Sequence, residues 1–235
     1  MDFSNQKRDI RLIGQGGNTK VYLLDSEYKG YSSAVIKQPL WFVDRKVDTM
    51  VKNHGLLMKH GIKTTQFLEE CTFDGGRAVI TENLHHDDYT CLDANAHLLT
   101  EQDRLLERLG PDYCIRSNNT KEPEEERKFA DRRFKKIINL EEFARNHLNE
   151  LRRISNVRIY LSYDCYFFKV KSVEVTDIDY VIADWDDIEV FDEPDLYIIN
   201  QKQFEVALMQ FLKRYVEEGK AKEYENVIRR FEDIV

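Results

Sequence analysis

In the first 84 residues, short apolar runs alternate with turn residues. Runs that are rich in β-branched residues and bounded by Gly, Asp or Asn are typical of strands. They predict strands at 9–13, 19–24, 32–38, 66–73 and 77–84. The sequence Asp74-Gly75-Gly76 predicts a hairpin between the last two. From Asp44 to His60, apolar residues recur every three or four positions, which predicts one helix that ends at Gly61.

Beyond residue 84 the apolar spacing becomes mostly helical. It predicts helices at 98–109, 139–154, 203–219 and 221–235, another that begins at Pro123, and strands at 157–161, 166–173 and 179–184. We therefore expect an α+β protein in two parts. A β-rich N-terminal lobe covers residues 1–84, and a mainly helical C-terminal lobe covers 85–235 with an insertion at about 100–136.

Composition and charge exclude several classes of protein. With 42% hydrophobic and 33% charged residues, the chain is neither collagen-like nor wholly disordered. A net charge of −8 argues against nucleic acid as a partner. No apolar run approaches the ~20 residues of a membrane span, so we expect no membrane partner. The four cysteines form no CxxC pair and the N-terminus has no secretory signal, which predicts reduced, packed thiols and a cytoplasmic location.

A strongly basic run, Arg127–Lys136, contains six Lys or Arg residues and follows the three glutamates at 124–126. One interpretation is a solvated helix face whose charge those glutamates balance. The other is a docking patch for an acidic or phosphate-bearing partner.

The first residues that suggest chemistry are glycines. Gly14, Gly16 and Gly17 lie between two predicted strands, where a glycine-rich hairpin lets backbone N–H groups approach phosphate oxygens. An ordinary hairpin has the same composition. Lys37, 23 residues after Gly14, closes a β-branched strand, and a buried ammonium needs a partner charge. Beside a phosphate-covering loop, Lys37 would neutralise nucleotide phosphates.

Two aspartates in the C-terminal half also stand out. Asp184 ends an apolar strand, and Asp164 lies in the segment 159–168 that follows a helix. A carboxylate at the end of a buried strand costs free energy unless it binds a metal or joins a hydrogen-bond network. Each aspartate taken singly is also compatible with a turn or a cap. Asp186 is either a turn residue or an assisting metal ligand.

Taken in order, these residues resemble the motifs of the protein kinase-like superfamily. The motifs are Gly14-x-Gly16-x-x-Thr19-x-Val21, Val35-Ile36-Lys37, a hinge at Glu82, Asp164 and Asp184-Trp185, across about residues 9–190. Trp185 looks more like the aminoglycoside- and small-molecule-phosphotransferase branch than like eukaryotic-type protein kinases. The resemblance implies a two-lobe fold, with an antiparallel sheet and one helix in the N-terminal lobe.

The resemblance also implies ATP and Mg²⁺ as ligands. The ATP phosphates would be covered by Gly14, Gly16 and Gly17, and Val21 is the last residue of the same motif. Lys37 would contact the phosphates.

The remaining roles follow from the same resemblance. The backbone of Glu82 and Leu84 would bind adenine, and Thr81 would guard the rear pocket. Asp164 would orient the attacking hydroxyl or accept its proton, and Asp184 would hold Mg²⁺.

Some positions depart from the family pattern. Lys169 stands where the family carries an Asn as second metal ligand, so it would either compete with Mg²⁺ or itself neutralise phosphate charge. The helix at 44–60 has no Glu to pair with Lys37, and Asp44 and Asp48 are the candidate substitutes.

Three functions stay open at this point. The first is an ATP-dependent phosphotransferase that acts on a hydroxyl of a small molecule or a protein. The second is a catalytically impaired pseudokinase that binds a nucleotide or a protein. The third is an α+β domain unrelated to kinases.

Overall fold

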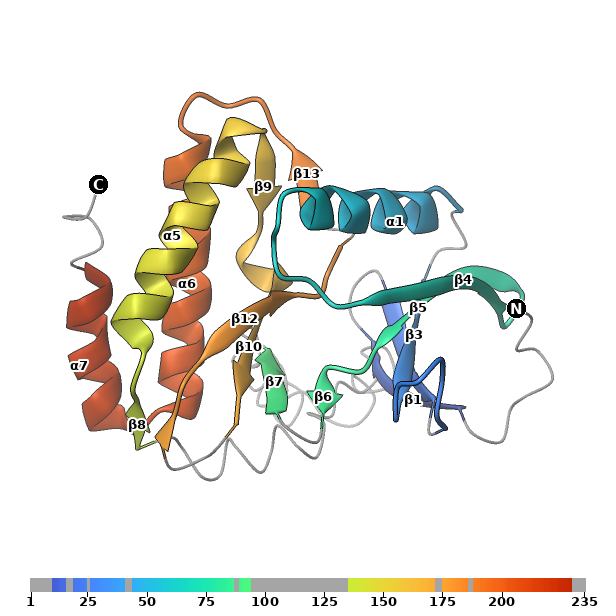
Figure 1. Cartoon of the computed structure of the whole chain (residues 1–235), viewed down its shortest axis with the longest axis horizontal. Helices are drawn as coiled ribbons and strands as arrows, with labels where there is room; N and C mark the ends of the chain where they lie inside the picture. The colour runs from blue at the N-terminus through green and yellow to red at the C-terminus, as the bar shows by residue number, and fades with distance from the viewer. Residues whose placement is uncertain are drawn as a thin grey trace, which may run out of the picture.

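The computed structural model describes residues 10–15, 19–24, 26–40, 44–86, 89–93, 135–171, 175–185 and 188–229. A five-stranded sheet and helix α1 (Asp44–Lys59) lie on one side of the molecule. On the other side, helices α5 (Leu140–Asn156), α6 (Leu196–Tyr215) and α7 (Glu218–Arg229) lie roughly side by side (Figure 1). Short strands of the C-terminal half lie between the two sides.

The N-terminal sheet is antiparallel, with strand order β1-β2-β3-β5-β4. Its strands are β1 (Ile10–Gln15), β2 (Thr19–Leu24), β3 (Ala34–Pro39), β4 (Phe67–Phe73) and β5 (Gly76–Glu82). Asp74 and Gly75 join β4 to β5 with φ angles of 47° and 79°. Positive φ at both central residues is what a two-residue hairpin turn requires, so the predicted hairpin is confirmed.

Helix α1 ends in a Schellman motif. Gly61 adopts φ 71°, the Gly61 N–H donates to Met58 O at 3.1 Å, and the Ile62 N–H donates to Leu57 O at 3.0 Å. Ile62 is buried immediately after this stop. The predicted helix and its glycine terminus are therefore confirmed.

The N-terminal sheet has a different apolar cluster on each of its two faces. Ile36 and Ile80 belong to a small cluster confined to this sheet. Val79, on the opposite face, joins a large cluster that contains Val47 and Met50 of α1 together with the core of the C-terminal half. Helix α1 is therefore packed against the C-terminal half as well as against the sheet.

The C-terminal half contains a second antiparallel sheet and two small strand pairs. The sheet order is β12-β10-β7-β6. Its strands are β6 (His85–His86), β7 (Tyr89–Asp93), β10 (Tyr166–Val170) and β12 (Asp179–Ile182). The pairs are β9 (Ile159–Leu161) with β13 (Ile188–Val190), antiparallel, and β8 (Lys136–Ile137) with β11 (Val175–Thr176), parallel.

The core of this half is rich in aromatic side chains. Phe143 of α5, Phe168 of β10, and Phe204 and Phe211 of α6 are buried together. The ring centroids of Phe168 and Phe211 lie 4.7 Å apart. Among the described residues, no helix combines the length and apolar character needed to cross a membrane.

The mixed α+β class with an antiparallel N-terminal sheet is confirmed, but some expected elements are not. Strands β6 and β7 follow Leu84 where the spacing predicted mostly helix, and β13 was not predicted. Helix α6 begins at Leu196 instead of residue 203. The helices predicted at 98–109 and from Pro123, and the insertion at about 100–136 up to residue 134, lie outside the described residues.

Buried thiols agree with the expected packing role of the cysteines. Cys71, Cys91 and Cys165 are buried and none is in a disulfide. Burial raises the pKa of the Cys71 thiol to about 12, so this thiol stays protonated and unreactive.

Two glycines should respond in opposite directions to replacement by Ala, because neither has an atom within 4 Å of the added methyl group. Gly75→Ala should lower the free energy of unfolding by about 1 kcal/mol, because only the positive φ is penalised. Gly55→Ala, inside α1, should raise it by about 0.5–1 kcal/mol through helix propensity. Urea denaturation midpoints measure both. An unchanged midpoint for Gly75→Ala would contradict the turn conformation.

Candidate functional site

Lys37 joins the two halves of the protein through its ammonium group. Its side chain is only 6% exposed, although it lies on a strand of the N-terminal sheet. Its Nζ donates to the Ala183 carbonyl oxygen at 2.5 Å and lies 3.5 Å from Asp184 Oδ1. A buried charge needs such acceptors, and here both come from the segment that follows β12.

Asp184 is the exposed member of this pair, with 42% of its side chain accessible. The residues around it are firmly held. The Trp185 side chain is fully buried, and its indole N–H donates to Thr64 Oγ1 at 2.7 Å. Asn53 of α1 donates to the backbone carbonyls of Trp185 and Ile188 at 2.6 and 2.8 Å. The Asp184 carboxylate is therefore presented on a fixed backbone.

Asp164 lies next to the residue that is hydrogen-bonded to the end of β12. In the antiparallel pairing of β10 with β12, Tyr166 is opposite Ile182. The Ala183 N–H donates to Cys165 O at 3.2 Å, which continues the pairing by one position. Asp164 is the residue before Cys165, in the short 3₁₀ helix Tyr163–Cys165. Asp164 Oδ1 is buried and makes no hydrogen bond within the described part of the chain.

The backbone beside Asp164 is anchored by α6. The Tyr163 N–H donates to Gln203 Oε1 at 3.0 Å, and the Leu161 N–H donates to Asn200 Oδ1 at 2.9 Å. Asn200 is itself fully buried and donates to the Ile159 carbonyl at 2.9 Å. Both aspartates are thus carried by segments that buried amides hold in place.

The described part of the glycine-rich segment lies in line with Lys37. Gly14 of β1 pairs with Val21 of β2, and Val21 pairs with Lys37 of β3. These three residues therefore form a row across adjacent strands. Gly16 and Gly17 lie outside the described residues, as does Asp186.

The predicted hinge residues lie at and just after the end of β5. Thr81 is fully buried, and its hydroxyl donates to Glu82 O at 3.1 Å. The Glu82 N–H donates to Gln66 O at 3.1 Å, and the Gln66 N–H donates to Glu82 Oε1 at 2.9 Å. Leu84 is half-buried, two residues beyond β5. Their adenine-binding roles stay predictions.

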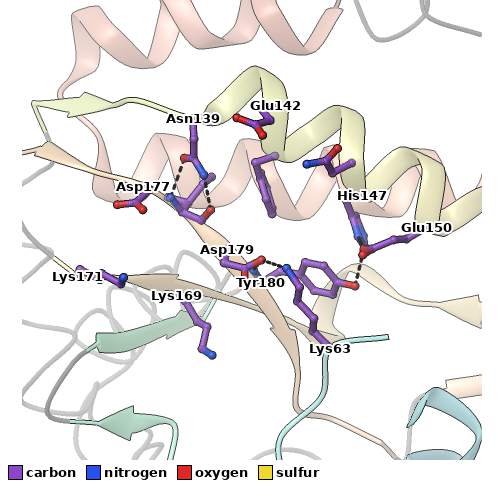
Figure 2. A pocket seen from close by; sticks show the side chains of 13 residues that line it. Lys63, Asn139, Glu142, His147, Glu150, Lys169, Lys171, Asp177, Asp179 and Tyr180 are labelled. Atoms are coloured by element: carbon purple, nitrogen blue, oxygen red, sulfur yellow. Dashed lines mark hydrogen bonds and ion pairs between the residues drawn. The ribbon is translucent and has the colours of Figure 1, made fainter. Parts of the chain in front are cut away.

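Lys169 belongs to a different region. It is opposite Asp179 in the β10–β12 pairing, three positions beyond Tyr166, the first residue of β10, which is roughly 10 Å along the strand. There it lines a cleft of about 570 Å³ between α5 and this hairpin (Figure 2). The Lys63–Asp179 ion pair, at 2.6 Å, and the two bonds of Asn139 to the backbone of Ile178 occupy much of the polar lining. The structure therefore does not bring Lys169 together with Asp184.

A buried polar network borders this cleft. His147 is fully buried, with Nδ1 2.9 Å from Glu150 Oε2 and Nε2 2.9 Å from the Tyr166 hydroxyl. The Tyr180 hydroxyl donates to the same Glu150 oxygen at 2.7 Å. Burial lowers the pKa of His147, so a neutral ring donates from Nδ1 and accepts at Nε2. Burial alone would raise the pKa of Glu150, but the hydrogen bonds from His147 and Tyr180 lower it.

The expected substitution of Asp48 for the missing helix Glu is wrong. Asp48 Oδ1 lies 2.7 Å from Arg77 Nη2, which also binds Glu70 at 2.6 Å. Asp48 faces β5 from the exposed side of α1, so it does not reach Lys37. The side chain of Asp44 lies outside the described residues.

Asn53 is the functional candidate that the sequence analysis missed. It lies in the apolar stripe of α1, between the buried residues Met50 and Leu57. A polar residue within an apolar stripe needs a hydrogen-bond partner, and this position is the signal that identifies it. Of the basic run Arg127–Lys136, only the last two residues lie among the described residues.

A scan against protein-family models finds no match to this sequence. A search of curated proteins finds no match either.

Acidification should destabilise the protein through His147. Burial lowers the pKa of His147 from its ordinary value of about 6.5, so the unfolded state binds a proton more readily than the folded state. The free energy of unfolding should therefore fall as the pH drops below 6.5. His54, whose pKa burial also lowers, adds to the slope. His147→Gln should flatten the pH dependence of the urea midpoint. Tyr166→Phe, the control, should lower stability at every pH and keep the slope; equal slopes in wild type and His147→Gln would exclude this role.

Proposed function

We propose that this chain is a kinase-like phosphotransferase that moves the γ-phosphoryl group of ATP to a hydroxyl of a small molecule or a protein. One observation carries the proposal. Lys37 of the N-terminal sheet contacts Asp184 of the C-terminal half. Cys165, the neighbour of Asp164, accepts a hydrogen bond from Ala183, the neighbour of Asp184. One ammonium and one carboxylate thus meet, and the second carboxylate lies on the adjoining segment, in the order of the kinase-like motifs.

The charges of these residues suit a nucleotide triphosphate. Lys37 supplies positive charge in a buried position, where electrostatic interactions are stronger than in water. The row Gly14–Val21–Lys37 leads from the glycine-rich segment to that charge. We infer that the ATP phosphates bind along this row and against Lys37.

The donor set also fits Mg²⁺. This ion is usually bound by one or two carboxylates together with substrate phosphates. Asp184 offers a partly exposed carboxylate on a fixed backbone, and Asp164 lies on the adjoining segment. Asp184 would hold the ion, which when bound would neutralise charge on the β- and γ-phosphate oxygens.

Asp164 is the group we assign to the acceptor substrate. Its Oδ1 is buried and unbonded within the described residues, so it has capacity for a donor from a ligand. It would accept a hydrogen bond from the attacking hydroxyl, orient it, and take its proton as the bond to phosphorus forms. The Gln203 and Asn200 contacts to the preceding backbone hold Asp164 in that position.

A nucleotide-binding protein without transferase activity is the second candidate. The position of Lys169 favours it, because the residue five places after Asp164 lines a separate cleft and is a cation instead of a metal ligand. This second function predicts ATP binding without turnover.

Thermal unfolding with ATP, with and without Mg²⁺, tests nucleotide binding. A ligand at about 100 times its dissociation constant stabilises a protein by about 2.7 kcal/mol, which raises the melting temperature by roughly 2–4 °C at this size. We expect such a shift in wild type with Mg²⁺, and its loss in Asp184→Asn. Phosphate release from ATP should fall by roughly 10²-fold in the same variant.

Asp179→Asn is the matched control. It removes the carboxylate of another Lys–Asp pair, five residues earlier in the chain. It should leave the ATP shift and the turnover unchanged. Binding without turnover would favour the second candidate, and no shift in wild type at saturating ATP would exclude both.

A further inference from the structure

A single buried amide connects α1 to the backbone on both sides of residues 186–187. Asn53 is 5% exposed, and its amide nitrogen donates to Trp185 O at 2.6 Å and to Ile188 O at 2.8 Å. An amide NH₂ has two hydrogens, so both are used. The two carbonyls cannot be satisfied by an apolar residue or by a carboxylate, because neither donates a hydrogen bond.

Trp185 adds a second connection to the same region. Its indole N–H donates to Thr64 Oγ1, and the Thr64 hydroxyl donates to Ile182 O at 2.8 Å. The ring lies 4.5 Å from the His54 ring of α1, between centroids, and 5.8 Å from Lys37 Nζ. The backbone carbonyls of Ile182, Trp185 and Ile188 are therefore held by α1 and by Thr64, which follows it.

No charged contact between α1 and Lys37 occurs among the described side chains. Asp48 pairs with Arg77, and the buried Met50 lies on the inner face of the helix. Lys37 is instead bound to Ala183 O and Asp184. The contacts from α1 toward the Lys37–Asp184 pair are therefore the hydrogen bonds of Asn53 to the backbone and the contact of His54 with the Trp185 ring.

We propose that Asn53 is a positioning residue, which places Asp184 against Lys37 by fixing the backbone carbonyls of Trp185 and Ile188 onto α1. The position of α1 therefore sets the position of the backbone on either side of residues 186–187, next to Asp184. The effect on nucleotide affinity rests on the proposed function, but the mechanical link does not.

The mechanical link is tested without nucleotide by the fluorescence of Trp185. The chain has two tryptophans, so Trp41→Phe leaves Trp185 as the single emitter. In this background, Asn53→Leu and Asn53→Asp should shift the emission to longer wavelength and raise quenching by acrylamide. Asn53→Gln keeps the donors on a longer side chain and should restore part of the protection.

Asn139→Leu is the matched control. Asn139 also makes two backbone bonds through its amide, both to Ile178 at 2.9 Å, but it does not contact α1. It should lower the urea midpoint without exposing Trp185. Unchanged quenching in both Asn53→Leu and Asn53→Asp, or equal exposure in Asn139→Leu, would overturn the proposal.

The functional consequence is measured as ATP affinity. Asn53→Leu removes the two buried hydrogen bonds to Trp185 O and Ile188 O. This loss should weaken Mg²⁺-dependent ATP binding by about tenfold. Binding without Mg²⁺ and binding by Asn139→Leu should change little. If wild type binds no ATP, the proposed phosphotransferase function fails, and the quenching result alone decides whether Asn53 positions the segment.

Discussion

The buried ammonium group of Lys37 needs hydrogen-bond acceptors, and this need connects the two halves of the protein. Lys37 lies on the face of the N-terminal sheet that is turned toward the large core, because it pairs with Val79 of that cluster. Its acceptors are Ala183 O and Asp184, 146 and 147 positions further along the chain. An unpaired lysine there would be strongly destabilising. The sheet therefore folds correctly only against the end of β12, which makes the same contact structural and functional.

Buried amides determine how the other elements meet. Apolar contacts tolerate small displacements and repacking, whereas an amide between two backbone groups defines one arrangement. Asn53 fixes α1 against the backbone of Trp185, and Asn200 fixes α6 against β9. Asn139 fixes the start of α5 against the start of β12. His147 has the same effect in the aromatic core, where it links α5 to β10 and, through Glu150, to Tyr180. Asn53, Asn200 and His147 are polar residues within otherwise apolar faces, whereas Asn139 is the N-cap residue of α5.

Local sequence was sufficient for the elements that are stabilised locally. The β4–β5 turn and the end of α1 were predicted because Asp74-Gly75 and Gly61 require specific backbone angles. Strands β6 and β13, only 2 and 3 residues long, are too short to show an alternating apolar pattern, and β13 also depends on pairing with the distant strand β9. The start of α6 was missed because Tyr197, Ile198 and Ile199 favour strands.

The candidate site also contains residues whose positions the sequence predicted and residues whose positions it did not. Lys37 and Asp184 were predicted from their positions at the ends of apolar strands, and the structure brings them together. The pairing of Asp48 with Arg77 was not predictable, because it depends on how α1 is oriented over β5. Lys169 illustrates a related limit. Its spacing from Asp164 suggested proximity, but a strand carries it steadily away from that residue.

The division of the apolar core between the two faces of the N-terminal sheet has a consequence for partial unfolding. Helix α1 shares its cluster with the C-terminal helices, whereas one face of the sheet has a small cluster of its own. Cooperative unfolding units follow packed clusters more closely than they follow the order of the chain. The outer strands β1 and β2 can therefore open while α1 stays protected with the C-terminal half. Amide hydrogen exchange would place α1 in the slow-exchanging unit, although it lies between β3 and β4 of the N-terminal sheet in sequence.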